Sequence, residues 1–198
     1  TKMRKYLTTK LKSASIANIR IDRSAEAVTI TIFTPKPGVV IGRGGQGVEE
    51  LKKKLKTMVM QSGKKVMVKL NIQEVDKPDQ NAQVVMHNIA EQLEKRFPFR
   101  RAMKQAIDSV MKSGAMGVKV EVAGRLNGSE IARTEHLAEG RLPLQTLRAN
   151  VQFARGIAQT TYGVIGVKVW VYTGDLFGTQ EEEKPEEQES QTRTLRTR

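Results

Sequence analysis

Four consecutive residues, Gly42-Arg43-Gly44-Gly45, combine the features that bind an anion. Gly42 and Gly45 lack a Cβ, so the turn can take a positive φ and a sugar-phosphate backbone can lie directly against the main chain. A helix that begins near Gln46 would offer unpaired N–H groups and the positive end of its dipole, and Arg43 adds a full charge. The stretch therefore predicts a phosphate cradle for nucleic acid, although Gly-x-x-Gly alone is common in turns.

The same glycines also fit a rival pattern, because Gly42, Gly44 and Gly47 satisfy the G-x-G-x-x-G of dinucleotide-binding units. Such a unit needs a long buried strand before the glycines, and only residues 39–41 separate them from a Pro-rich stretch. It also needs an acidic residue about 20 positions later to hold a ribose, where this chain is basic and apolar at residues 64–69. We therefore rank dinucleotide binding below RNA binding.

The charge of the chain favours a polyanionic partner. The 198 residues include 34 Lys and Arg against 21 Asp and Glu, which gives a formal net charge of +13 and a pI near 10.1. The acidic residues are concentrated at the end, where residues 181–198 carry a net charge of −2. The basic charge therefore lies on the rest of the chain, as is typical of nucleic-acid-binding proteins.

Several classes of site are excluded by what the sequence lacks. There is no Cys, so disulfides, thiolate metal sites and Cys nucleophiles are excluded. His87 and His136 are the only histidines, too few for a metal cluster or a triad, and both fall in predicted helices. No apolar run reaches the ~18 residues that span a bilayer. We expect a cytoplasmic chain with no metal, cofactor, small-molecule substrate or membrane partner.

Hydrophobic periodicity divides the first half of the chain into five elements. Apolar residues recur at helical spacing before Ser13 and after the glycine loop, and they alternate with polar residues elsewhere. The Ser62-Gly63 pair is expected to end the second helix. The predicted elements are a helix over 1–13, strands over 16–21 and 28–32, a helix from about 46, and a strand over 66–73.

The second half is predicted to form its own α+β unit. Strands are expected around residues 118–123, 147–154 and 167–172, where Val and other apolar residues alternate with polar ones. Two helices, 80–96 and 99–111, precede the strands and should cover one sheet face. A further helix is predicted over Glu130–Leu137, with Ser129 as its N-cap.

The helix after Pro98 sorts its charges by face. At ~100° per residue, its apolar side chains gather on one side, while Arg100, Arg101 and Lys104 occupy the other. These three cations should face solvent. A solvated helix surface would show the same pattern, so the periodicity alone does not assign them a ligand.

The order helix, strand, strand, glycine loop, helix, strand resembles the type II KH domain, which clamps single-stranded nucleic acid. By this resemblance the phosphate contacts fall to Gly42, Arg43, Gly44 and Gly45, and residues 40–41 (Val40 and Ile41) support an apolar groove for the bases. Gly44 departs from the family, because a Lys or Arg often stands at that position.

Four longer blocks resemble the family of bacterial ribosomal small-subunit protein three. They are Phe99–Lys104, Gly124–Glu135, Glu139–Ala149 and Thr160–Trp170. The resemblance covers residues 3–177, and it implies a further basic segment ahead of Thr1 in family members.

What this resemblance implies is a structural, non-enzymatic protein in the head of the small ribosomal subunit. Its implied partners are small-subunit (16S) rRNA, mRNA and the neighbouring head proteins ten and fourteen. Arg100, Arg101 and Lys104 would line the mRNA entrance channel and help to hold and unwind incoming message. A free KH-type RNA regulator is the alternative, and a nucleotide-cofactor enzyme is a more distant one.

The expected fold class is α+β, in two domains with a tail. Residues 1–97 would form the type II KH domain, a three-stranded sheet with helices. Residues 98–178 would form helices packed on a mostly antiparallel sheet, and the Glu-rich residues 179–198 would be disordered. Pro98, which interrupts two helical patterns, marks the expected junction.

Overall fold

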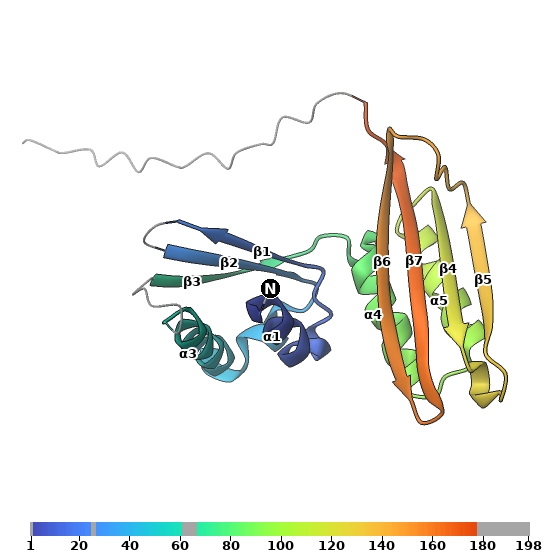
Figure 1. The fold of residues 1–198 in the computed structure, drawn as a ribbon. Coiled ribbons are helices and arrows are strands. Elements are labelled where there is room, and N and C mark those ends of the chain that lie inside the picture. Colours follow the sequence, from blue (N-terminus) through green and yellow to red (C-terminus); the bar gives the residue numbers. More distant parts are fainter. Residues whose placement is uncertain (1, 25–26, 61–66, 178–198) are drawn as a thin grey trace, which may run out of the picture.

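In the computed structural model, which describes residues 2–24, 27–60 and 67–177, the chain forms two sheets, each with its own helices (Figure 1). Each sheet has a separate core of buried apolar side chains. The predicted α+β class is confirmed. The predicted helix end at Ser62-Gly63 and the predicted disordered tail, residues 179–198, lie outside the described residues.

The N-terminal unit has the predicted element order, with one additional short helix before the glycine loop. That short helix begins at Pro37, whose fixed φ suits a first helical position. The elements are α1 (Lys2–Lys10), η1 (Lys12–Ala14), β1 (Asn18–Arg23), β2 (Ala27–Thr34), α2 (Pro37–Ile41), η2 (Arg43–Gly45), α3 (Gln46–Met60) and β3 (Met67–Glu74).

The N-terminal sheet has the order β1-β2-β3, with β1 antiparallel and β3 parallel to the central β2. Ile30 on β2 is fully buried and lies opposite Ile21 on one side and Leu70 on the other. The helices cover one face of this sheet (Figure 1), and Leu7 of α1 and Leu55 of α3 are fully buried there. This core fixes α2 and α3, and with them the glycine loop.

The C-terminal unit contains four strands, one more than predicted. Its sheet has the order β5-β4-β7-β6, and all neighbouring strands are antiparallel. The elements are η3 (Pro78–Gln80), α4 (Ala82–Glu94), α5 (Phe99–Lys112), β4 (Gly117–Gly124), η4 (Leu126–Gly128), β5 (Arg133–Gly140), β6 (Ala149–Thr160) and β7 (Gly163–Asp175).

Both long helices pack on the same face of this sheet. α4 contacts β6 and β7, and α5 contacts β4 and β5. Val120 and Val169 point into the core from the sheet, where Ile89 of α4 and Met103 of α5 are also buried. Asn81 caps α4, because its side-chain oxygen accepts hydrogen bonds from the backbone of the first turn. Two of the predicted helices are therefore confirmed.

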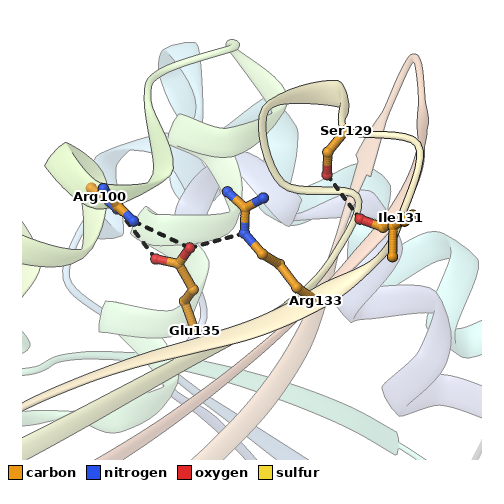
Figure 2. A network of polar contacts seen from close by, with 5 residues as sticks. All are labelled: Arg100, Ser129, Ile131, Arg133 and Glu135. Carbon is orange, nitrogen blue, oxygen red and sulfur yellow. Dashed lines mark hydrogen bonds and ion pairs between the residues drawn. The ribbon is translucent and has the colours of Figure 1, made fainter.

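The predicted helix over Glu130–Leu137 is wrong. This segment enters β5, whose residues pair with β4 from Gly117↔Gly140 to Gly124↔Arg133. The Ser129 hydroxyl caps no helix, because it donates to the carbonyl oxygen of Ile131 at 3.0 Å (Figure 2). Strand pairing with β4 overrides the local helix signals, and His136 lies in a strand rather than in a helix.

The strand predicted from Leu147 begins two residues later, at Ala149, and Leu147 itself is fully exposed. β6 and β7 continue beyond the predicted strands and form a long hairpin. The predicted period of two holds in this hairpin, but the predicted faces of β6 are wrong, because Phe153 is exposed and Ala154 is buried.

The connection between α4 and α5 has an unusual residue at its centre. α4 ends in a Schellman motif, in which the Phe97 N–H bonds to the Gln92 carbonyl and the Arg96 N–H bonds to the Leu93 carbonyl. Arg96 takes the left-handed conformation there, with φ 63°. Glycine is the usual residue at this position, because a side chain makes the conformation costly.

The division of the chain at Pro98 stays a prediction. α4 lies before this residue, yet its buried side chains, including Met86 and Ile89, belong to the C-terminal core. The packing of α4 therefore favours a division before Asn81 instead of at the junction expected from the Pro98 interruption.

Candidate nucleic-acid interface

The glycine loop joins α2 to α3 and has the backbone conformation that the sequence predicts. Gly42 and Gly45 take φ values of 72° and 81°, and Gly44 takes 59°. A Cβ added to Gly44 or Gly45 would meet no atom within 4 Å, so the outer side of the loop is open to a ligand. The positive φ values and the open surface together allow a backbone phosphate to approach the main chain.

Gly47, the first residue that sequence reasoning missed, sets the angle between α2 and α3. A Cβ at this position would lie 2.8 Å from the carbonyl oxygen of Val40 and 3.0 Å from that of Ile41. The two helices therefore meet backbone to backbone. The sequence pattern marks Gly47 only as the last glycine of G-x-G-x-x-G, and its packing role depends on a contact that spacing does not reveal.

The apolar residues beside the loop divide into a buried and an exposed set. Val40 is 1% exposed and belongs to the N-terminal core, whereas Ile41 is 41% exposed. Val40 thus anchors α2, and Ile41 offers apolar surface next to Arg43, which is exposed. A cleft of about 440 Å³ lies on the other side of this pair, where Val40, Tyr6 and Lys54 line it and Ile41 does not.

α5 presents the predicted basic face. Arg100, Arg101 and Lys104 are exposed, and the opposite side of the helix is buried in the C-terminal core. The buried side chains of α5 are Phe99, Ala102, Met103, Ile107 and Val110. The sorting of charges by face is therefore confirmed as geometry.

One of these cations is held by a carboxylate. Arg100 donates from Nε and Nη2 to the two oxygens of Glu135 at 3.2 and 3.4 Å, and Arg133 donates to Glu135 Oε1 at 2.9 Å (Figure 2). The hydrogen bond from Arg100 lowers the pKa of Glu135 below its ordinary value, with Arg133 adding to the effect. The carboxylate is therefore ionised at neutral pH and shares its charge between two arginines.

Arg133 extends the basic face onto the sheet. Its guanidinium lies 5.9 Å from the centroid of the Phe99 ring, and the guanidinium of Arg100 lies 5.7 Å from the same centroid. Sequence reasoning missed Arg133, because residues 130–137 were predicted to be helical. The sequence gives little sign of the strand, because Leu137 is the only large apolar residue between Arg133 and Gly140 and no apolar-polar alternation can form around it.

The described residues contain no group of three or more His, Asp or Glu side chains that could hold a metal ion. His87 is partly buried in α4, and burial lowers its pKa, with the charge of Lys12 adding to the effect. It contacts Gln83 at 3.3 Å and so acts as a neutral packing residue. None of the helices in the described ranges is long and apolar enough to cross a membrane.

Comparison with known proteins links both units to one kind of assembly. A family model described as "KH domain" matches residues 2–80, and one described as "Ribosomal protein S3, C-terminal domain" matches residues 89–171. A relative from Clostridium acetobutylicum named "Small ribosomal subunit protein uS3" is 54% identical over 186 residues, 94% of this chain and 82% of the relative. Relatives of the same name from Alcanivorax borkumensis and Pseudomonas aeruginosa are 49% and 51% identical, over 95% and 92% of this chain and 80% and 78% of the relatives.

Proposed function

The chain belongs to the ribosomal protein S3 family, and from this premise we propose that it binds rRNA in the small ribosomal subunit and lines the mRNA entrance channel. A structural, RNA-binding and non-enzymatic role follows from the family. The channel and the individual RNA contacts are the proposed part.

The observation that carries the proposal is the open glycine loop on a KH-type scaffold. Gly44 and Gly45 face open space, and Arg43 is exposed between glycines with positive φ. KH loops of this kind clamp about four backbone nucleotides. We assign Gly42, Arg43, Gly44 and Gly45 to phosphate contacts and Ile41 to the adjoining apolar groove, with Val40 as its buried support.

The mRNA contact is assigned to α5. Arg101 and Lys104 are exposed and form no ion pair within the described part of the chain. Arg100 is tethered to Glu135, which Arg133 also contacts, so two arginines share this one carboxylate. Such a face attracts phosphate without a nucleotide cofactor, and movement of the ribosome would supply the work of unwinding. Head proteins ten and fourteen are the proposed protein neighbours.

Co-sedimentation tests the assignment to the ribosome. The tagged chain is expressed in a bacterial host, and its distribution over a gradient is measured at high salt. Retention in the small-subunit fraction is expected, because many contacts with folded rRNA and proteins resist screening together. Release as a free protein at modest salt would instead support a free KH-type RNA regulator.

A further inference from the structure

A pocket of about 340 Å³ lies where three separate segments of the C-terminal unit meet. The segments are the α4–α5 connection, the η4 turn and the β6–β7 hairpin. We propose that this pocket binds one unpaired nucleotide of RNA, with the base on Tyr162 and the phosphate on Arg96. The proposal rests on the proposed function, since it names a further contact with RNA.

The pocket has the size and the lining that a nucleotide needs. Its volume falls at the lower end of the range of small-ligand sites. Its charged side chains are Arg96 and Arg125, and none of the described residues that line it is acidic. Asn127 and Thr161 add polar groups that can hydrogen-bond the edge of a base. A positively charged pocket with polar and aromatic walls suits a nucleotide better than an acidic or purely apolar pocket would.

Tyr162 provides an open aromatic face. The residue is 58% exposed, and its ring packs over Gly128, where an added Cβ would lie 3.1 Å from two ring carbons. The ring thus rests against the η4 backbone on one side, and more than half of the residue stays exposed. Phe97, at 45% exposed, is a second ring at the same pocket. Splayed-out bases of single-stranded RNA stack on such rings.

Arg125 holds the two walls together. Its Nε donates to the carbonyl oxygen of Ser129 at 2.8 Å, and its Nη1 donates to that of Tyr162 at 3.2 Å. The η4 turn and the hairpin are therefore connected through one guanidinium. Arg125 is a positioning residue, because it fixes the backbone carbonyl of Tyr162.

Arg96 is the cation that remains for a phosphate. It is exposed, and the described residues give it no carboxylate partner. It occupies the left-handed position at the end of α4, where a glycine would be less strained. Strained positions of this kind concentrate at functional sites. The strain here places a guanidinium at the edge of the pocket.

The pocket adjoins the basic face of α5. Phe99 lines the pocket, and its ring lies 5.7 Å from the guanidinium of Arg100. The pocket and the basic face therefore meet at Phe99, so a strand bound on the face lies beside the pocket. The neighbouring position favours RNA over a free nucleotide as the occupant.

Oligonucleotide binding to the full chain tests the proposal. The probe is an unstructured octaribonucleotide with 2-aminopurine at its centre, whose fluorescence is quenched by stacking. Tyr162→Leu should abolish the quenched population and weaken binding at least about fivefold, the lower end for one base stacked on a ring. Tyr162→Phe should retain both, because the ring is kept. Phe153→Leu, an exposed ring away from the pocket, serves as the control.

Arg96→Gly separates binding from stability. Glycine suits the left-handed conformation, so the variant should be as stable as the wild type or more so. It should still make the dependence of log K for RNA binding on the logarithm of the salt concentration less steep by roughly 0.7, the value for one phosphate contact on a single strand. Lys95→Gly, made one residue earlier, removes a charge without emptying the edge of the pocket.

The outcomes distinguish the pocket from the proposed function. Octanucleotide binding by the wild type that Tyr162→Leu leaves unchanged would overturn the pocket alone. Absence of binding by the wild type would overturn both. If Tyr162→Leu leaves RNA binding unchanged but weakens incorporation into subunits, the proposal that the pocket binds a nucleotide is overturned, and the pocket is assigned to a protein neighbour.

Reconstituted subunits identify the source of the nucleotide. Chemical probing of rRNA in subunits without mRNA, with wild-type or Tyr162→Leu protein, detects an rRNA nucleotide whose reactivity rises in the variant. Cross-linking of a 4-thiouridine mRNA detects a loss of contact with the message. A change in either measurement supports the proposed nucleotide site and identifies whether rRNA or mRNA occupies it. If neither measurement changes, the proposal is overturned.

Discussion

Gly47 on α3 faces the carbonyl oxygen of Val40 on α2 so closely that a Cβ would come within 2.8 Å of it. Gly47→Ala should therefore push α2 from α3 and destabilise the chain by roughly 1–3 kcal/mol, as overpacking does. Chemical denaturation measures this change. Gly38→Ala is the control, since an added Cβ there meets no atom within 4 Å and should be neutral or stabilising. Equal stability of both variants would contradict the backbone contact.

Reversing the charge of the glycine loop should weaken RNA binding. Arg43→Asp with Gly44→Asp places two carboxylates where phosphate is expected, in a conformation that Asp tolerates. Binding of single-stranded RNA by the full chain should weaken, and the salt slope should fall by roughly 0.7 for each lost contact. Lys112→Glu with Gln145→Glu, both exposed, is a control that lowers the charge elsewhere. If the control weakens binding as much, the effect belongs to net charge and not to the loop.

The packing of α4 predicts which fragments fold alone. A fragment of residues 1–81 keeps the whole N-terminal core, whereas 1–96 adds a helix whose apolar face has lost its sheet. We expect the longer fragment to bind a hydrophobic dye and to leave the α4 amides unprotected in hydrogen exchange. Protected α4 amides in 1–96 would instead support the division at Pro98.

The sequence predicts correctly the helices and strands that have a clear hydrophobic periodicity. It fails where pairing with another strand determines the secondary structure. The helix of the basic face and the strand containing Val120 have strong periodicity, and both are where they were expected. β5 has only Leu137 packed against the core, so its helix-like composition misled the prediction, and Arg133 was missed with it. Likewise, the apolar stripe of α4 shows that the helix is covered but not which sheet covers it.

The carboxylate of Glu135 should restrain RNA binding at the basic face. Glu135→Gln removes the charge that Arg100 and Arg133 share, so affinity for single-stranded RNA and the salt slope should both increase. The pKa of Glu135 is lowered, so its ion pairs add stability above its unfolded pKa and lose it as the pH falls through the lower folded value. Wild-type affinity should approach that of the variant over the same fall in pH. Equal affinities at pH 7 would show that the carboxylate does not compete with RNA.

The three α5 cations should matter most when the message is paired. Arg100→Ala, Arg101→Ala and Lys104→Ala together keep helix propensity high and remove no core side chain, so folding and incorporation into subunits should survive. If these side chains hold the strand after base pairs open, elongation through a stable hairpin should slow, while elongation on an unstructured message stays nearly normal. Salt should narrow the difference between wild type and variant, because screening weakens contacts that only the wild type makes. The measurement is the elongation rate on matched structured and unstructured templates. Equal slowing on both would indicate a general assembly defect, and no slowing on either would show that the basic face is only solvated surface.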